Sequence, residues 1–334
     1  MRLLVASEKR GGRKTASVED PALVPMLQQA VREDTAGSPV EPDQLWTNRS
    51  PTELADELTE QGHPVDPKTV QRMLKEDLGL SHRQMVKNLA MGESADREAQ
   101  FQRVKEFKAE FLEQGFAVLS IDTKKKELLG KFHRSGPAWT NGRVRAWDHD
   151  FPSSSWGKVI PYGVYDVARN ESLVYLAQGA DTGQLAVDAI RRWWYRLGTW
   201  QYPMDAPLLL LADCGGSNGY RVPLFREQLQ HLANRLGKTI RVCHLPPYCS
   251  RYNPIDHRLF CHISRSLQSV MLRSIKIIRE AINRTTTHQG LRVVTELARK
   301  LYPSGIKASP EYLKRETVIR DEILPQLNYR FEPQ

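Results

Sequence analysis

The segment Leu208-Leu209-Leu210-Leu211-Ala212-Asp213 is an uninterrupted apolar run that ends in a carboxylate. An apolar run of this length, without polar alternation, is typical of a strand that is buried on both faces in a parallel sheet. A second run, Ala117-Val118-Leu119-Ser120-Ile121, is followed by Asp122 in the same way. The two runs indicate an α/β fold that presents carboxylates at the mouth of its sheet.

A third aspartate, Asp256, opens a predicted helix after Asn253-Pro254-Ile255. Carboxylates that lie within a few ångströms of one another repel and do not all stay ionised unless a cation lies between them. Two Mg²⁺ or Mn²⁺ ions would supply that charge and would hold both the attacking and the leaving oxygen of a phosphoryl displacement. Asp122, Asp213 and Asp256 are therefore the predicted catalytic and metal-binding residues. Each of them alone is also consistent with an ordinary strand or helix cap.

Length and charge limit the class of protein. A chain of 334 residues favours one large domain and a smaller one, and its 40% hydrophobic and 26% charged residues are ordinary for a globular protein. No apolar run is long enough for a membrane span or a signal peptide, so we expect a cytoplasmic protein. The net charge of +9 divides into −4 for residues 1–99 and +13 for residues 100–334. The larger domain is thus expected to bind a polyanion, unless the charge only solubilises it.

The four cysteines contain no C-x-x-C pair. Cys243, Cys249 and Cys261, with the neighbouring histidines, could be combined into a zinc site, but their spacing matches no standard pattern. Reduced thiols are the default in a cytosolic protein.

The chain is expected to divide into a basic arm and linker (residues 1–43), a helix-turn-helix DNA-binding domain (44–95) and a catalytic domain (96–334). Ser50-Pro51 with Glu53 predicts one capped helix, and Asp66-Pro67 starts a second after the turn at Gly62. Two such helices fit either a helix-turn-helix or an ordinary helical hairpin. In the first case the outward face of the second helix would contact DNA through Lys68, Thr69, Gln71, Arg72 and Lys75.

Periodicity beyond residue 96 predicts a ribonuclease-H-like order of elements. A helix over 96–115 precedes a strand over 117–121 and an edge strand over 124–132. The pair 162–167 and 172–177 completes an antiparallel meander of three strands. Helices are then expected over 185–197, 219–236, 254–268 and 274–287, and strands over 208–212 and 239–245. The expected catalytic domain is a mixed five-stranded sheet with flanking helices, preceded by the small all-α domain.

Six motifs are spread along this chain: Asp122-Thr123-Lys124-Lys125-Lys126-Glu127, Pro161-Tyr162-Gly163-Val164-Tyr165-Asp166, Ala212-Asp213-Cys214-Gly215-Gly216-Ser217-Asn218-Gly219, His244-Leu245-Pro246-Pro247, Asn253-Pro254-Ile255-Asp256-His257-Arg258-Leu259-Phe260 and Thr285-Thr286-Thr287. Together they closely resemble the Rhodopirellula-type DDE transposases of bacterial insertion sequences, a group similar to the mariner superfamily. The likeness runs from Gly11-Gly12-Arg13-Lys14 to the end of the chain.

The resemblance implies a metal-dependent DNA strand transferase that acts on double-stranded DNA, both the terminal inverted repeats of its element and target DNA. It implies a homodimer and a nucleoid-associated bacterial location. The first two acids of the family match Asp122 and Asp213, whereas the family normally has glutamate where this chain has Asp256. Lys124, Lys125, Asn218 and Arg258 are the expected DNA contacts of the catalytic domain. His149, Asp150, Asn253 and His257 are candidate auxiliary residues.

Other departures suggest an altered copy. Tyr248-Cys249-Ser250-Arg251-Tyr252 and Leu267-Gln268-Ser269 replace motifs that the family usually conserves, and a further upstream helix-turn-helix is missing. The reading frame is therefore interpreted as N-terminally truncated. Two alternatives stay open: a catalytically inactive relic that only binds DNA, and a ribonuclease-H-like nuclease that hydrolyses without joining.

Overall fold

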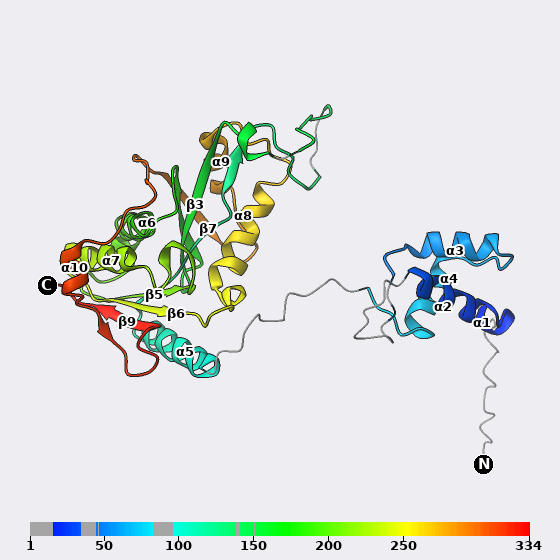
Figure 1. Cartoon of the computed structure of the whole chain (residues 1–334), viewed down its shortest axis with the longest axis horizontal. Coiled ribbons are helices and arrows are strands. Elements are labelled where there is room, and N and C mark those ends of the chain that lie inside the picture. The colour runs from blue at the N-terminus through cyan, green and yellow to red at the C-terminus, as the bar shows by residue number, and fades with distance from the viewer. Residues whose placement is uncertain (1–15, 35–44, 46, 83–95, 138–140, 150) are drawn as a thin grey trace, which may run out of the picture. The chain divides into compact units, whose positions relative to one another are not determined.

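The computed structural model describes residues 16–34, 45, 47–82, 96–137, 141–149 and 151–334. The chain divides into two compact units, residues 1–88 and residues 89–334 (Figure 1). Of the predicted basic arm and linker (residues 1–43), residues 1–15 and 35–43 lie outside the described residues.

The described part of the smaller unit is helical. Its helices are α1 (Ala16–Glu19), α2 (Leu23–Asp34), α3 (Pro51–Glu60) and α4 (Pro67–Glu76). The predicted caps are present: the Ser50 hydroxyl accepts from the N–H of Glu53 at 3.2 Å while the Glu53 carboxylate accepts from the N–H of Ser50 at 2.6 Å. The Asp66 side chain accepts from the N–H of Lys68 at 2.7 Å. Each cap satisfies a helix N–H group that has no partner inside the helix.

The expectation that residues 1–43 form only an arm and a linker is wrong for α2. Leu27 and Val31 of this helix are fully buried in one core with Leu54 and Leu58 of α3 and Val70 of α4. Apolar residues four positions apart lie on one face of a helix, so α2 can bury a stripe against both later helices. The helical unit therefore begins well before residue 44.

The larger unit is built on a nine-stranded mixed sheet. Its strands are β1 (Ala117–Thr123), β2 (Glu127–Leu129), β3 (Gly157–Asp166), β4 (Glu171–Ala177), β5 (Leu208–Ala212), β6 (Ile240–His244), β7 (Arg292–Leu297), β8 (Ile319–Arg320) and β9 (Asn328–Phe331). The order is β7-β4-β3-β1-β5-β6-β9-β8, and β2 pairs with β3 outside this path.

The five predicted central strands lie together in this sheet, with β1, β3 and β4 antiparallel and β1, β5 and β6 parallel. The predicted number of strands is wrong. Strand β7 extends one edge by pairing parallel with β4, while β9 extends the other by pairing antiparallel with β6. These additions protect the backbone groups that would otherwise form exposed edges.

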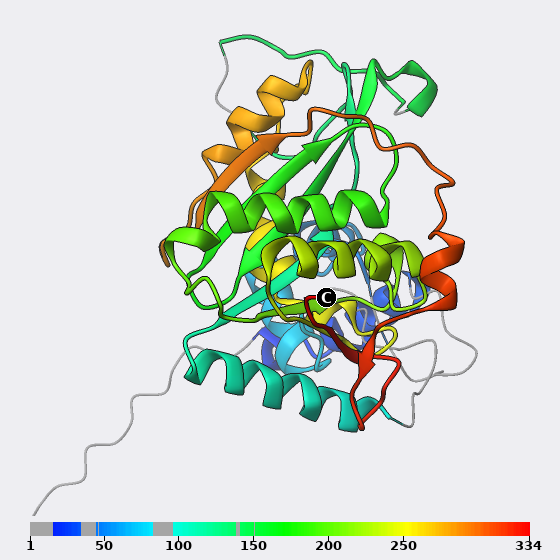
Figure 2. The same cartoon turned by 90° about the vertical axis from the view of Figure 1, so that its left-hand side faces the viewer.

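Helices cover both faces of the sheet. Helices α6 (Gly183–Arg196) and α7 (Pro223–Leu236) pack on one face, where Figure 2 shows them side by side. Helices α5 (Arg97–Glu113), α8 (Cys261–Ser266) and α9 (Ile275–Asn283) bury apolar residues on the other face. The short helix α10 (Pro310–Lys314) lies near the end of the chain. Within the described ranges, none of these helices combines the length and the hydropathy that a membrane span requires.

Three predicted helices differ clearly in their bounds. The helix expected over 274–287 ends at Asn283. The helix expected over 219–236 begins only at Pro223, because proline suits the first position of a helix. The helix expected over 254–268 is divided into a π-helical turn, η5 (Asp256–Phe260), and the regular helix α8. A π-helical turn carries an extra residue, which shifts the side chains that follow it relative to those before it.

Gly163 of β3 couples the sheet to η5. A Cβ atom at this position would lie 2.7 Å from Ile255 Cδ1 and 2.8 Å from Phe260 Cε1, closer than ordinary contact. Both side chains are buried. The absence of a side chain at Gly163 therefore provides the space in which the segment carrying Asp256 rests on the sheet.

We expect Gly163→Ala to lower the free energy of unfolding by about 1–3 kcal/mol, because the added methyl group overpacks the contact with Ile255 and Phe260. Urea unfolding measures this change. Gly142→Ala is the matched control, since a Cβ there meets no atom within 4 Å. Equal stability of the two variants would contradict the packing argument.

Candidate active site

Three aspartates that are far apart in the sequence lie at one end of the sheet. Asp122 is near the end of β1, and Asp213 directly follows β5. These strands are parallel and pair Ile121 with Ala212, so their carboxyl ends meet. Asp256 opens η5, and its charge reaches both other aspartates.

The three carboxyl groups interact through their charges. Burial raises the pKa of Asp122 to about 7, and the negative charges of Asp213, Asp256 and Asp181 add to the increase. Burial and the charge of Asp256 raise the pKa of Asp213 to about 6. The pKa of Asp256 is itself raised by burial. Ionising these groups together therefore costs free energy that a bound cation would offset.

A buried hydrogen-bond network holds Asp213 against the neighbouring elements. The Asn253 side chain donates to Asp213 Oδ1 at 3.0 Å and accepts from the Ser120 hydroxyl at 2.5 Å. The Ser120 oxygen in turn accepts from the N–H of Ile255 at 3.0 Å. One amide and one hydroxyl thus connect β1, the acid after β5 and the turn that precedes Asp256. Ser120 was missed by the sequence reasoning, although a hydroxyl in an otherwise apolar run was a signal.

His244 positions the backbone of Asp213 and was also not predicted. This fully buried side chain lies at the end of β6, and burial lowers its pKa to about 4. Its Nδ1 lies 2.9 Å from the carbonyl oxygen of Asp213, and its Nε2 lies 2.8 Å from the Tyr329 hydroxyl. Because the carbonyl only accepts, Nδ1 carries the proton and Nε2 accepts from the tyrosine.

Asn218 is placed differently from the expected phosphate contact. Its side chain is buried, and its Nδ2 lies 3.5 Å from the carbonyl oxygen of Ile121, next to Asp122. The turn that contains it, η3 (Gly216–Asn218), is separated by several residues from the start of α7. Asn218 therefore supports the end of β1 and does not present its amide to a ligand.

Lys124 is likewise not exposed for DNA, in contrast to the expectation. Its ammonium group is buried and forms an ion pair of 2.5 Å with Glu127, which also pairs with Arg134 at 2.6 Å. Burial of a lysine requires such a partner. Lys125, the next residue, is exposed as a DNA contact would require.

Arg258 and His257 are exposed residues of η5, the turn that also carries Asp256. Burial and the charge of Arg258 lower the pKa of Lys108, so these two cations lie near each other. His257 Nε2 contacts the carbonyl oxygen of Arg251. Arg258 thus adds positive charge to the turn that carries the third acid.

None of the contacts described for His149 involves Asp122, Asp213 or Asp256. The His149 ring is exposed, pairs with Asp148 at 3.3 Å and stacks on Phe151 with ring centroids 5.4 Å apart. Asp150, the other candidate from this loop, lies outside the described residues.

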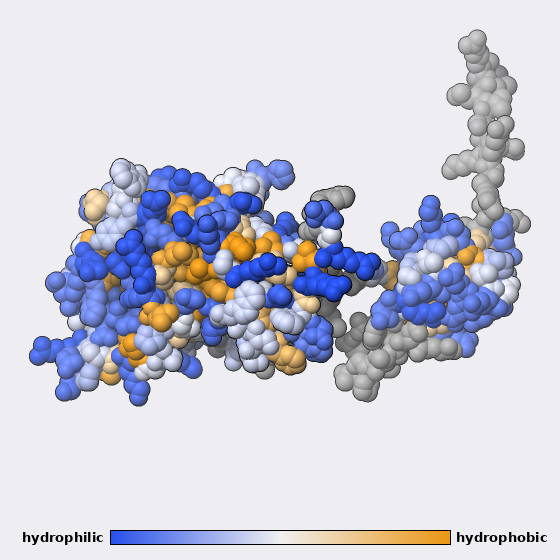
Figure 3. Space-filling view, turned by 90° about the horizontal axis from the view of Figure 1, so that it is seen from above, coloured by the Kyte–Doolittle hydropathy of each residue, from blue (hydrophilic) through white to orange (hydrophobic). Residues whose placement is uncertain are grey.

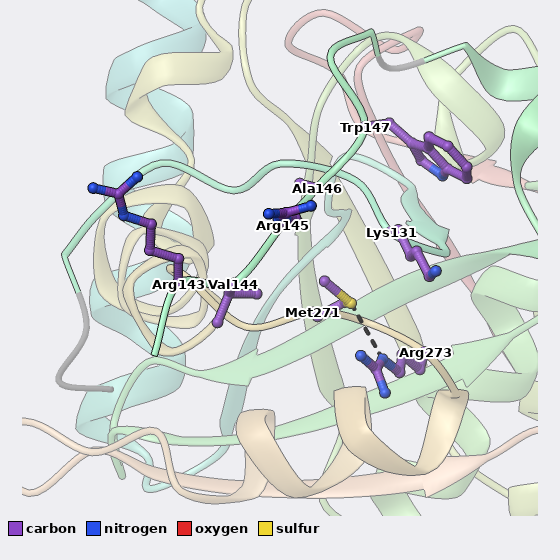
Figure 4. A pocket seen from close by; sticks show the side chains of 8 residues that line it. All are labelled: Lys131, Arg143, Val144, Arg145, Ala146, Trp147, Met271 and Arg273. Carbon is purple, nitrogen blue, oxygen red and sulfur yellow. Dashed lines mark hydrogen bonds between the residues drawn. The ribbon is translucent and has the colours of Figure 1, made fainter. Parts of the chain in front are cut away.

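We name the described residues between 130 and 156 the basic-aromatic loop. This loop borders a hollow of about 490 Å³. Lys131, Arg143, Arg145 and Arg273 supply cations to its lining, and Arg273 turns towards Met271 (Figure 4). The face of the larger unit seen in Figure 3 carries apolar patches among hydrophilic side chains. Large exposed apolar side chains of the loop are Val144, Trp147, Phe151 and Trp156. Cations interleaved with aromatic rings are typical of nucleic-acid contacts.

Helix α4 has one buried face and one exposed face. Val70 and Met73 are buried in the core of the smaller unit. The predicted DNA contacts lie away from that core: Lys68, Gln71, Arg72 and Lys75 are exposed and Thr69 is half-buried. The exposed face of α4 is thus polar and basic, as the predicted contact with DNA requires.

The donor set fits a hard divalent cation better than zinc. Carboxylate oxygens are the ligands that Mg²⁺ and Mn²⁺ prefer. The four cysteines are free thiols, and burial raises the pKa of Cys214 and Cys243 to about 12. Among the described residues, no three His, Cys, Asp or Glu side chains are close enough together to hold one ion. The aspartates therefore interact over a distance, and an ion would have to draw them together.

We expect Asp122→Asn to stabilise the metal-free protein at pH 8 and to have little effect near pH 4. The folded pKa of about 7 lies above the usual 3.8, so the folded state holds this proton more tightly and stability falls as pH rises through that interval. The gain at pH 8 is at most about 4 kcal/mol, since each pKa unit corresponds to about 1.4 kcal/mol. Urea unfolding in EDTA at both pH values measures it, with the exposed Asp205→Asn as control. A gain of equal size at both pH values would contradict the assignment.

Comparison with known proteins agrees with the likeness seen in the sequence. The chain is similar to the Mos1 transposase paired-end complex with left transposon end (16% identity, 83% of this chain and 73% of that chain, TM-score 0.40). It is also similar to the Mos1 mariner paired end complex with Mn (16% identity, 82% and 72%, TM-score 0.41). No curated protein matches the sequence. The model of the Rhodopirellula transposase DDE domain matches residues 26–333, and the chain therefore belongs to that transposase family.

Proposed function

We propose that this protein is a metal-dependent DNA transposase that cuts DNA at the ends of an insertion sequence and joins the freed ends to target DNA. The observation that carries the proposal is the meeting of Asp122, Asp213 and Asp256 at the carboxyl end of β1 and β5, where each carboxyl has a raised pKa. The strand order β4-β3-β1-β5-β6 supports a ribonuclease-H-like assignment for the larger unit.

Some residues of the chain would bind the metal ions, and others would position those metal ligands. Asp122, Asp213 and Asp256 would hold two Mg²⁺ or Mn²⁺ ions, which supply the positive charge that stabilises the oxygens of an in-line phosphoryl displacement. Asn253 orients the Asp213 carboxylate through its 3.0 Å bond, and His244 fixes the backbone of the same residue. Because Asp256 is shorter than the usual glutamate, its reach depends on the packing of η5 against Gly163.

DNA is the proposed partner of both units. In the smaller unit, α3 and α4 would act as a helix-turn-helix, with the exposed face of α4 in the major groove. In the larger unit, the cations of the basic-aromatic loop, Lys125 and Arg258 would contact phosphates, in agreement with the +13 charge of residues 100–334. Pairing of two transposon ends would require a homodimer, and the substrate would place the protein at the bacterial nucleoid.

We expect Asp213→Ala to reduce cleavage of duplex DNA carrying the inverted repeats that flank the gene by at least about a hundredfold, the scale of losing one group that stabilises the reacting centre. Gel assays of the full chain with Mn²⁺ or Mg²⁺ measure cleavage and joining. Asp205→Ala, an exposed aspartate away from the acids, should act as the parent does.

The same assay separates the proposed function from its alternatives. Strand transfer by the parent supports the transposase. Hydrolysis without joining would instead indicate a nuclease, and binding without either reaction would indicate an inactive relic. If Asp213→Ala cuts as well as the parent, the assignment of the acids is wrong.

We expect Arg72→Ala and Lys75→Ala each to weaken binding to the terminal repeats and to lower the salt dependence of binding by about one released counterion. Glu76→Ala on the same helix should not weaken binding, because it removes a negative charge. Fluorescence anisotropy between about 50 and 200 mM salt measures both quantities. Unchanged affinity in both basic variants would rule out α4 as the DNA-contacting helix.

A further inference from the structure

Asp181, an acidic residue that the sequence reasoning did not select, is held near Asp122, and its charge acts on that residue. It lies between β4 and α6. Gly179, two residues earlier, has a φ of +97° and approaches Tyr302 so closely that a Cβ would lie 2.4 Å from the Tyr302 carbonyl oxygen. The N–H of Ala180 donates to that oxygen at 2.7 Å, and Thr182 caps α6 by accepting from Leu185. The backbone on both sides of Asp181 is therefore fixed.

Thr123 brings Asp181 and Asp122 to the same point. Its backbone N–H donates to Asp122 Oδ1 at 2.7 Å, and its hydroxyl donates to Asp181 Oδ1 at 3.1 Å. Two carboxylates thus accept hydrogen bonds from one residue at the end of β1. Such a pair is repulsive unless a positive charge lies nearby.

No described lysine, arginine or histidine forms an ion pair with Asp181. Asp188, on the following helix, shows the contrast: it pairs with Arg191 at 2.8 Å and Lys300 at 2.7 Å and accepts from the Tyr302 hydroxyl. Asp188 is a neutralised structural carboxylate. The protein offers Asp181 no comparable cation in the described residues.

Tyr162 provides a second, independent observation. It lies opposite Thr123 in the pairing of β1 with β3, it is fully buried, and its hydroxyl has no hydrogen-bond partner among the described residues. Burial raises the pKa of Tyr162, and the charges of Asp122, Asp181 and Asp213 add to the increase. An unsatisfied buried hydroxyl costs free energy, so a donor left free beside three acids indicates that an oxygen of a ligand or its hydration shell belongs there.

We propose that Asp181 is a fourth carboxylate of the acid site and binds a divalent cation together with Asp122. This inference rests on the proposed function and extends its ligand set. Mg²⁺ and Mn²⁺ accept several carboxylate and water oxygens, so an additional carboxylate suits either ion. The Tyr162 hydroxyl would orient the oxygens around the ion.

Binding of Mn²⁺ to the full chain without DNA tests the inference by isothermal titration calorimetry. We expect Asp181→Asn to weaken Mn²⁺ binding at least about tenfold, as expected for loss of a group that holds a metal. The metal-free melting temperature should stay equal or rise, because one of two repelling charges is removed. Asp205→Asn should bind Mn²⁺ as the parent does. Asp181→Glu, which keeps the carboxylate, should bind more tightly than Asp181→Asn and covers the case in which the latter does not fold.

Thr123→Val separates a ligand from a residue that only positions Thr123. It removes the hydroxyl contact and keeps both carboxylates, so Mn²⁺ affinity should stay within about threefold of the parent, well short of the loss expected for a ligand. An equal loss in Thr123→Val and Asp181→Asn would overturn the inference. Parent-like binding by Asp181→Asn, with weakened binding by Asp122→Asn, would overturn it and leave the proposed function intact. If the parent binds no Mn²⁺, or Asp122→Asn binds it equally well, the metal site of the proposed function fails as well.

Discussion

The parallel pairing of β1 with β5 is the constraint on which the site depends. It places Asp122 and Asp213 at adjacent strand ends, where the buried strands that create the site also remove its carboxylates from water. Both groups consequently have raised pKa values. Folding of the sheet therefore proceeds against a local electrostatic cost, which the large apolar core on both faces of the sheet outweighs.

The surrounding polar residues hold the buried aspartates in one geometry despite the electrostatic cost of their burial. Ser120 and Asn253 use their hydrogen bonds to join three segments, and His244 does the same for the backbone after β5. Because these groups are buried, an alternative arrangement would leave them without partners. Positioning of the acids is thus specified by neutral residues, whereas the acids themselves supply the charge.

The sequence was sufficient to predict the central strands, because uninterrupted apolar runs form a local pattern. Asp122 and Asp213 follow two of these runs and Asp256 opens η5, and their joint role in metal binding stays a prediction. The outer strands β7 and β9 were not predicted, since short polar-apolar segments become strands only when a sheet edge is available to pair with. Burial of Asn218 was missed for a related reason: its partner, the carbonyl group of Ile121, is contributed by tertiary packing. Lys124 pairs with Glu127 only three residues away, but burial of this ion pair also depends on tertiary packing. Asp181 follows a Gly-Ala loop and no apolar run leads directly into it, so no pattern marked it.

The bond between Tyr329 and His244 has a consequence for the order in which the protein matures on the ribosome. Tyr329 belongs to β9 and lies 85 residues after His244 in the sequence, yet its hydroxyl fixes this histidine, which holds Asp213. During synthesis, β6 therefore lacks its outer neighbour until β9 has been made. A nascent chain that stops before residue 328 lacks this support, so the acid site reaches its final geometry only after β9 has been made.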